Sequence, residues 1–109
     1  PDTVKKISKK AFSDCLCLNT VILSNNSQLQ EIKHAAFFFS ALTSFEIPPN
    51  VTKIGSETFC SCDYLQIIEI SEDSKLSSLN RNIFDVNINN LLMIPAKLRN
   101  SLGKYMILI

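Results

Sequence analysis

Apolar residues recur along this chain at short, uneven intervals that fit neither a helix nor one long strand. In the clearest stretch they stand at Val51, Ile54, Phe59, Leu65, Ile68 and Ile70. A helix would need steps of three and four throughout, and a strand would need steps of two. The gaps instead indicate a chain that turns a corner every few residues and sends one apolar side chain inward at each corner.

The same apolar pattern occurs four times. The units start at positions 4, 29, 51 and 76, which are 25, 22 and 25 residues apart, and a fifth start is expected at Leu98. Each unit has a Phe eight positions after its start, at 12, 37, 59 and 84. Repeats of this length predict a solenoid, because stacked units bury an apolar face that one unit cannot bury alone. Phe59, in the central unit, should be buried.

Each unit ends in a short run of alternating apolar residues, which predicts a β-strand. The inward residues of these runs are Val21 and Leu23, Phe45 and Ile47, Ile68 and Ile70, and Leu92 and Ile94. The strands should stack in parallel, about 4.8 Å apart, as one sheet along one side of the solenoid. The other side should consist of extended chain, tight turns or short helical turns. Pro48 and Pro95 each follow a strand and should end its pairing.

The unequal unit lengths arise mainly in the loops after the strands. Residues 24–28 and 71–75 are loops of five residues, whereas 48–50 has three. Such insertions belong at the surface. We expect repeats over residues 1–97, and a C-terminal cap or the start of a further unit over 98–109, with a final strand at 106–109. Because the chain begins partway into a repeat, we expect it to be the C-terminal part of a longer protein.

The third unit resembles the BspA-like (Treponema-type) leucine-rich repeats of bacterial surface proteins and mucosal protist parasites. From Val51 to Ile70 it fits the pattern Val-x-x-Ile-Gly-x-x-x-Phe-x-x-Cys-x-x-Leu-x-x-Ile-x-Ile. Unit two lacks the Cys, and unit four departs most, with an Asn-rich stretch at 87–90. The resemblance extends from about Val4 to Pro95. It implies a leucine-rich-repeat solenoid of about four repeats and a non-enzymatic binding role, often adhesion at a cell surface.

Composition narrows the classes of partner. The 109 residues include 11 Lys and Arg, 10 Asp and Glu and only 2 Gly, for a net charge of +1. This balance gives no reason to expect nucleic acid or an anionic membrane as a partner, and it argues against Gly-rich nucleotide loops. No apolar run approaches the roughly 20 residues of a membrane span, so membrane attachment would need segments outside this chain.

Two Cys-x-Cys pairs, Cys15 with Cys17 and Cys60 with Cys62, raise the question of a zinc site. Cys15 and Cys62 occupy the same position in units one and three, so roughly 10 Å should separate them. Zinc binding or a disulfide between them would need closer sulfur atoms. We therefore predict small buried side chains at a turn, with disulfides to units outside the chain as an alternative. No metal or cofactor is expected.

No catalytic residue is predicted. His34 is the single His, and the matching positions of the other units are polar, at Lys9, Ser56 and Arg81. His34 should therefore face solvent, whereas a Cys–His hydrolase would need a thiol beside it and a third group to orient it. The sequence predicts a protein that is not an enzyme.

The outward-facing residues of the predicted sheet are the candidate binding surface, since residues that alternate with core positions point away from it. They form one column of Thr20, Ser44, Ile67 and Leu91, and a second column of Ile22, Glu46, Glu69 and Met93. Four exposed apolar side chains around two acidic ones are typical of a contact surface. The alternative is that a flanking domain, a second chain or the C-terminal segment covers them.

Asn25-Asn26-Ser27 and Asn50-Val51-Thr52 are candidate N-glycosylation sites. Both lie in loops between units, where a glycan fits if the protein follows a secretory route. The leading interpretation is a cell-surface or secreted module that adheres to a host protein or glycan, or to extracellular matrix, through its sheet. The alternative is a cytoplasmic scaffold built on the same repeats.

Overall fold

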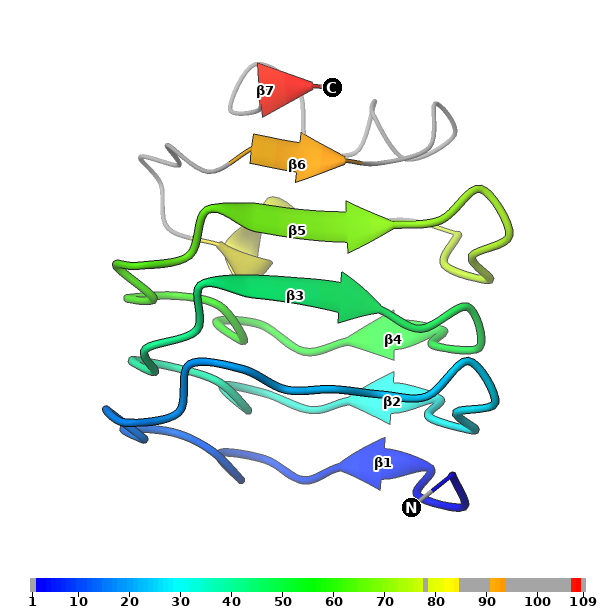
Figure 1. Ribbon diagram of the computed structural model, residues 1–109, viewed down its shortest axis with the longest axis horizontal. Coiled ribbons are helices and arrows are strands. Elements are labelled where there is room, and N and C mark those ends of the chain that lie inside the picture. Colours follow the sequence, from blue (N-terminus) through cyan, green and yellow to red (C-terminus); the bar gives the residue numbers. More distant parts are fainter. Residues whose placement is uncertain (1, 78, 85–90, 94–106, 109) are drawn as a thin grey trace.

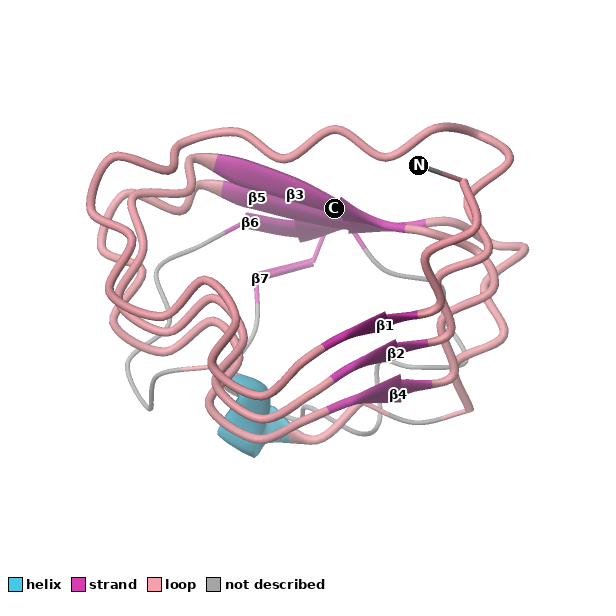
Figure 2. Cartoon of the chain, turned by 90° about the horizontal axis from the view of Figure 1, so that it is seen from below, coloured by secondary structure: helices cyan, strands magenta, loops and turns pink. Residues whose placement is uncertain are grey.

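The computed structural model describes residues 2–77, 79–84, 91–93 and 107–108. The chain coils as a solenoid in which each turn of the coil is one sequence unit (Figure 1). Two parallel sheets lie on opposite sides of the coil (Figure 2). One continuous cluster of apolar side chains fills the space between them. The predicted leucine-rich-repeat solenoid is thus confirmed.

The long sheet is the one that the alternating runs predict. It contains β3 (Ser44–Ile47), β5 (Ile67–Ile70), β6 (Leu91–Met93) and β7 (Ile107–Leu108), in that order and all parallel. Its cross-strand neighbours are the predicted ones, Ser44 with Ile67, Glu46 with Glu69, Ile67 with Leu91 and Glu69 with Met93. The inward residues of β3 and β5 are buried.

A second, small sheet runs through the first half of the units. It consists of β1 (Lys6–Ile7), β2 (Glu31–Ile32) and β4 (Lys53–Ile54), which pair in parallel. The sequence predicts extended chain, tight turns or short helical turns on this side. Strands of two residues are too short to show an alternation, and for that reason the sheet was not predicted.

Between the two sheets, units one to three make the same tight turn. Two repeat positions adopt the left-handed backbone conformation, with φ between 56° and 61°, at Lys10, Ala35 and Glu57 and again at Asp14, Phe39 and Ser61. For residues other than Gly this conformation costs about 1–2 kcal/mol. Backbone hydrogen bonds between successive units offset the cost, as from Lys10 N–H to His34 O at 3.0 Å. Unit four instead forms a short 3-10 helix, η1 (Arg81–Ile83).

A column of phenylalanine rings runs through the core. Phe12, Phe37, Phe59 and Phe84 stack in sequence, with ring centroids 5.5, 5.9 and 6.0 Å apart and ring planes within 15° of parallel. Phe45 of β3 packs tilted against two of these rings, with centroid distances of 5.2 and 5.4 Å. Phe59 is 3% exposed, which confirms its predicted burial. The column explains why each unit has a Phe at the same offset.

Gly55 marks a close approach between units two and three. Its N–H donates to Ile32 O at 2.7 Å. A Cβ atom at this position would lie only 2.3 Å from the backbone nitrogen of His34. The Ile-Gly pair of the third unit therefore serves the contact between neighbouring backbones, since only Gly leaves room for it.

Unit one departs from the predicted fold in its second half. No strand forms over residues 20–23, so the strand predicted around Val21 and Leu23 is wrong. Both side chains are half-buried against the core, but the backbone is not part of the long sheet (Figure 1). Pro48 and Pro49 directly follow β3 and have no N–H with which to extend pairing.

Several predictions for the C-terminal part fall outside the described residues. These are the inward position Ile94, the strand-ending Pro95, the start at Leu98 and the Asn-rich stretch 87–90. Of the predicted final strand at 106–109, Ile107–Leu108 forms β7 beside β6. The division into repeats over 1–97 and a cap or further unit over 98–109 stays a prediction. None of the helical structure that is described is long and apolar enough to cross a membrane.

Candidate binding face

The outward side of the long sheet is the candidate site, and we call it the long-sheet face. Its described side chains are Ser44 and Glu46 from β3 and Ile67 and Glu69 from β5. Ser44 and Glu46 are exposed, Ile67 is 37% exposed and Glu69 is half-buried. Leu91 and Met93 continue both columns along the backbone of β6, while their side chains lie outside the described part.

Two acidic side chains lie side by side on the long-sheet face. Glu46 and Glu69 are direct neighbours on parallel strands, an arrangement in which like charges repel. Within the described residues neither carboxylate forms an ion pair, in contrast to Glu57, whose Oε2 lies 3.6 Å from His34 Nε2. Among the described residues, no basic side chain therefore neutralises the two carboxylates by an ion pair.

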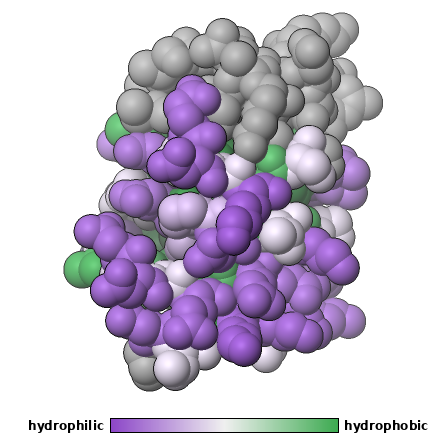
Figure 3. All heavy atoms as spheres, turned by 90° about the vertical axis from the view of Figure 1, so that its right-hand side faces the viewer, coloured by the Kyte–Doolittle hydropathy of each residue, from purple (hydrophilic) through white to green (hydrophobic). Residues whose placement is uncertain are grey.

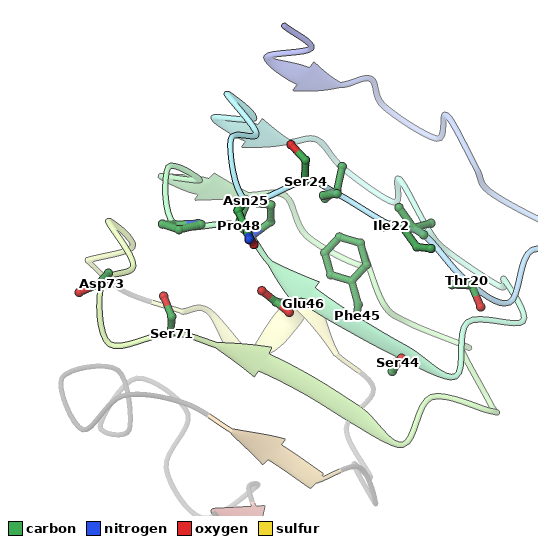
Figure 4. Close-up of a pocket in the computed structure, with 13 residues that line it drawn as sticks. Thr20, Ile22, Ser24, Asn25, Ser44, Phe45, Glu46, Pro48, Ser71 and Asp73 are labelled. Atoms are coloured by element: carbon green, nitrogen blue, oxygen red, sulfur yellow. The ribbon is translucent and has the colours of Figure 1, made fainter. Parts of the chain in front are cut away.

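A hollow of about 480 Å³ opens between β3 and the segment 20–25 of unit one. Figure 4 shows Thr20 and Ile22 on one side and Ser44 and Glu46 on the other. The lining combines apolar side chains with a polar rim and consists of Thr20, Val21, Ile22, Leu23, Ser24, Asn25, Ser44, Phe45, Glu46, Pro48, Pro49, Ser71 and Asp73. Apolar surface with a few polar groups is typical of a ligand site.

Hydrogen bonds join unit one to unit two before and after the segment 20–25. At one end Thr43 N–H donates to Asn19 O at 3.2 Å. At the other end Asn50 Nδ2 donates to Ser27 O at 3.3 Å. Residues 20–23 and β3 are both described in full. Between these two contacts, no backbone hydrogen bond joins them. The edge of β3 that faces unit one is therefore open.

Thr20 and Ile22 are predicted to belong to the two columns of the sheet, and this prediction is wrong. Both residues line the hollow instead. In the segment 20–25, Ile22 is 88% exposed, and the Thr20 hydroxyl donates to Asn19 Oδ1 at 3.1 Å. The structure places Ile22 in unit one and Ile67 on β5, two units further along the coil. Ile22 and Ile67, the two described apolar residues of the predicted patch, therefore do not form one continuous patch. Acidic and hydroxyl side chains lie around them. The binding role of all eight residues stays a prediction.

The two candidate glycosylation sites differ in accessibility. Asn25 is exposed in the turn after residues 20–23. Asn50 is half-buried, with its Nδ2 engaged by Ser27 O. It lies in a second hollow of about 380 Å³, with Lys5, Gln28, Gln30, Thr52 and Lys75. The side of the molecule that these turns form is largely hydrophilic (Figure 3). Glycosylation stays a prediction, and the geometry favours Asn25.

His34 is less exposed than predicted. Its side chain is 37% exposed, because unit three packs against it. His34 Nδ1 lies 2.8 Å from Ser56 Oγ, and Nε2 faces Glu57 as described above. His34 thus joins two units together.

The cysteines lie at turns, as predicted. Cys62 is buried, and its thiol donates to Phe37 O at 3.1 Å. Cys15, the equivalent residue of unit one, is only half-buried, so its predicted burial is wrong. No group of three or more His, Cys, Asp or Glu in the described part could hold a metal ion.

Short parallel strands, equal turns and an aromatic column in register define a leucine-rich repeat protein. The family model "BspA type Leucine rich repeat region (6 copies)" matches residues 1–105. The chain therefore belongs to the BspA-type leucine-rich repeat family.

Two solved structures are similar to this chain. A leucine rich cell surface protein from Faecalibacterium prausnitzii is 36% identical, with a TM-score of 0.62 over 69% of this chain and 19% of its own. A leucine-rich repeat protein from Bacteroides ovatus is 27% identical, with a TM-score of 0.59 over 94% of this chain and 31% of its own. The chain thus spans less than a third of either protein. None of the curated proteins compared with it matches significantly.

Proposed function

We propose that this chain is a non-enzymatic binding module of a cell-surface or secreted protein, and that it adheres to a host protein or glycan through its long-sheet face. The observation that carries the proposal is the adjacent pair Glu46 and Glu69, which forms no ion pair within the described residues, beside the exposed Ile67 and the hollow at β3. Exposed apolar groups next to unpaired charge favour contact with another molecule.

Membership of the BspA-type family supports a binding role, because leucine-rich repeat proteins typically serve as binding modules. One structural neighbour is described as a cell surface protein, which supports a location at the surface or outside the cell. A fold alone does not define a function, so the proposal depends on the residues of the long-sheet face.

The test compares binding of purified, fluorescently labelled chain to host epithelial cells. Ile67→Glu adds a charge to the long-sheet face at a side chain that is not in the buried core. Lys53→Glu, on β4, is the matched control on the opposite sheet. Both variants must first show the circular dichroism spectrum and thermal midpoint of the wild type.

The proposal predicts saturable binding that Ile67→Glu weakens about tenfold or more and that Lys53→Glu leaves unchanged. Treating the cells with protease or with glycosidase then separates a protein ligand from a glycan. Equal loss in both variants, or no saturable binding by the wild type, would contradict the proposal.

A further inference from the structure

We propose that the hollow beside β3 binds an extended peptide segment of a partner protein, which adds to the open edge of β3 as a parallel or antiparallel strand and places a Lys or Arg side chain between Glu46 and Asp73. The inference rests on the proposed binding role of the long-sheet face and names the form of its ligand. Three features of the structure support it.

The first feature is the open strand edge. β3 pairs with β5 on one side and is the terminal strand of its sheet within the described residues. Its other side faces the hollow, where residues 20–23 form no backbone hydrogen bond to it. An edge strand presents a row of N–H and C=O groups that another extended chain can pair with. Peptide recognition by strand addition uses such an edge.

The second feature is that the hollow already has the boundaries of a strand site. The contacts Asn19–Thr43 and Ser27–Asn50 hold the far wall in place at both ends. The hollow therefore spans the length of β3 without closing on it. The apolar residues of its lining are Val21, Ile22, Leu23, Phe45, Pro48 and Pro49, and of these Ile22 is 88% exposed. Apolar residues of a bound segment could pack there while its backbone pairs with β3.

The third feature is charge. Glu46 projects from β3 and Asp73 from the turn after β5, and both line the hollow. Neither carboxylate forms an ion pair within the described residues. No Lys or Arg of the described part lines the hollow. The site therefore selects a segment with a basic side chain and disfavours an acidic one.

The test uses the purified chain and a short capped peptide of alternating Thr and Val with a central Lys. Two further peptides serve as probes, one with Glu in place of the Lys and one N-methylated at alternate residues, which removes backbone donors and leaves the side chains unchanged. Binding is measured by fluorescence anisotropy with wild type, with Glu46→Lys and with the control Lys53→Glu.

The inference predicts that the Lys peptide binds wild type and Lys53→Glu equally, and binds Glu46→Lys about tenfold more weakly. Binding should also fall at least about tenfold with the Glu peptide and with the N-methylated peptide. In hydrogen exchange, the bound Lys peptide should slow amides of Ser44–Ile47 and leave those of β2 unchanged.

Equal binding of the N-methylated peptide would overturn strand addition, and equal binding of the Glu peptide would overturn the charge preference. Absence of binding by every peptide would overturn the inference as a whole. If host-cell binding is nevertheless lost in Ile67→Glu, the proposed function stands without a peptide ligand. If the chain does not bind cells but the Lys peptide binds as predicted, the proposed adhesion is contradicted. The inference of a peptide site beside β3 then still stands.

Discussion

The two sheets of this solenoid treat their charges in opposite ways. In the small sheet Lys6, Glu31 and Lys53 are cross-strand neighbours, so unlike charges alternate along the column. In the long sheet Glu46 and Glu69 are neighbours and lack an ion-pair partner within the described residues. Unlike cross-strand pairs stabilise a sheet and like pairs weaken it. Within the described residues neither column forms an ion pair, so the sheets differ in the pattern of their charges: unlike neighbours in the small sheet and like neighbours in the long sheet.

The sheets also differ in how they end. The small sheet continues without a break from unit one to unit three, and Gly55 brings its last two strands close together. The long sheet begins only at unit two, because unit one bows away from β3 and leaves the hollow. Along the first three units the same repeat thus pairs continuously on the small-sheet side and leaves a gap at β3 on the long-sheet side.

Removal of Phe59 should have the largest effect, because this ring lies in the column between the two sheets. Phe59→Ala should lower the free energy of unfolding by about 3–5 kcal/mol. Tyr64→Ala, at a side chain that is 67% exposed, is the control and should change it by less than about 0.5 kcal/mol. Chemical denaturation measures both. A denaturation midpoint unchanged by Phe59→Ala would show that the core is not built around this column.

The close contact of the small sheet is tested by Gly55→Ala. The added Cβ would meet the backbone of His34, so the two units must separate at a cost of about 1–3 kcal/mol. Ser8→Ala, at the same repeat position in unit one, is the matched control and should be nearly neutral. Thermal unfolding with the same baseline treatment measures the difference. Equal stability of the two variants would mean that the backbones of units two and three do not pack as closely at Gly55 as the structure shows.

The turn between the sheets is tested at two adjacent lysines. Lys10 has a φ of 58°, and Lys9 is not among the residues with positive φ. Lys10→Gly should therefore raise the free energy of unfolding by up to about 1 kcal/mol, whereas Lys9→Gly should lower it by a similar amount through lost backbone order. If both substitutions lower the free energy of unfolding, the left-handed backbone conformation at Lys10 does not cost the free energy that we assign to it.

The smallest expected effect tests the charge contrast directly. Glu31→Lys would place three lysines in a row and should destabilise the chain by about 0.5 kcal/mol. Glu46→Lys would convert a like pair into an unlike pair and should stabilise it by about the same amount. We expect the two changes in the free energy of unfolding to have opposite signs at low ionic strength. Added salt should make both changes smaller. The same sign at both positions would remove the electrostatic distinction between the sheets.

Much of this fold can be predicted from periodicity, because a stacked repeat places equivalent residues in equivalent environments. The Phe at a constant offset predicts the aromatic column, and the alternating runs predict the pairing of Ser44 with Ile67. What the sequence does not show are contacts made by backbone alone. The small sheet involves two residues per unit, and the need for Gly55 depends on how closely His34 approaches.

The hollow could not be predicted for a different reason. Val21 and Leu23 have the alternation of a strand, and their side chains do turn toward the core. Their backbone nevertheless forms no hydrogen bond to β3, and the alternation of apolar residues does not show this. One signal was available, since Pro48 and Pro49 lack the N–H groups that would hold a neighbouring chain after β3. Charge alternation in the small sheet was equally visible in hindsight, but only once the register of its strands was known.

The most direct test of the account is hydrogen exchange on the wild-type chain, alone and captured on host epithelial membranes. The account predicts that capture slows amides of β3 and β5 about tenfold or more and leaves those of β1, β2 and β4 unchanged. Such a footprint would place the contact on the long sheet without any substitution. Protection confined to the small sheet, or no change on either sheet, would contradict the claim that the long-sheet side is the one that binds.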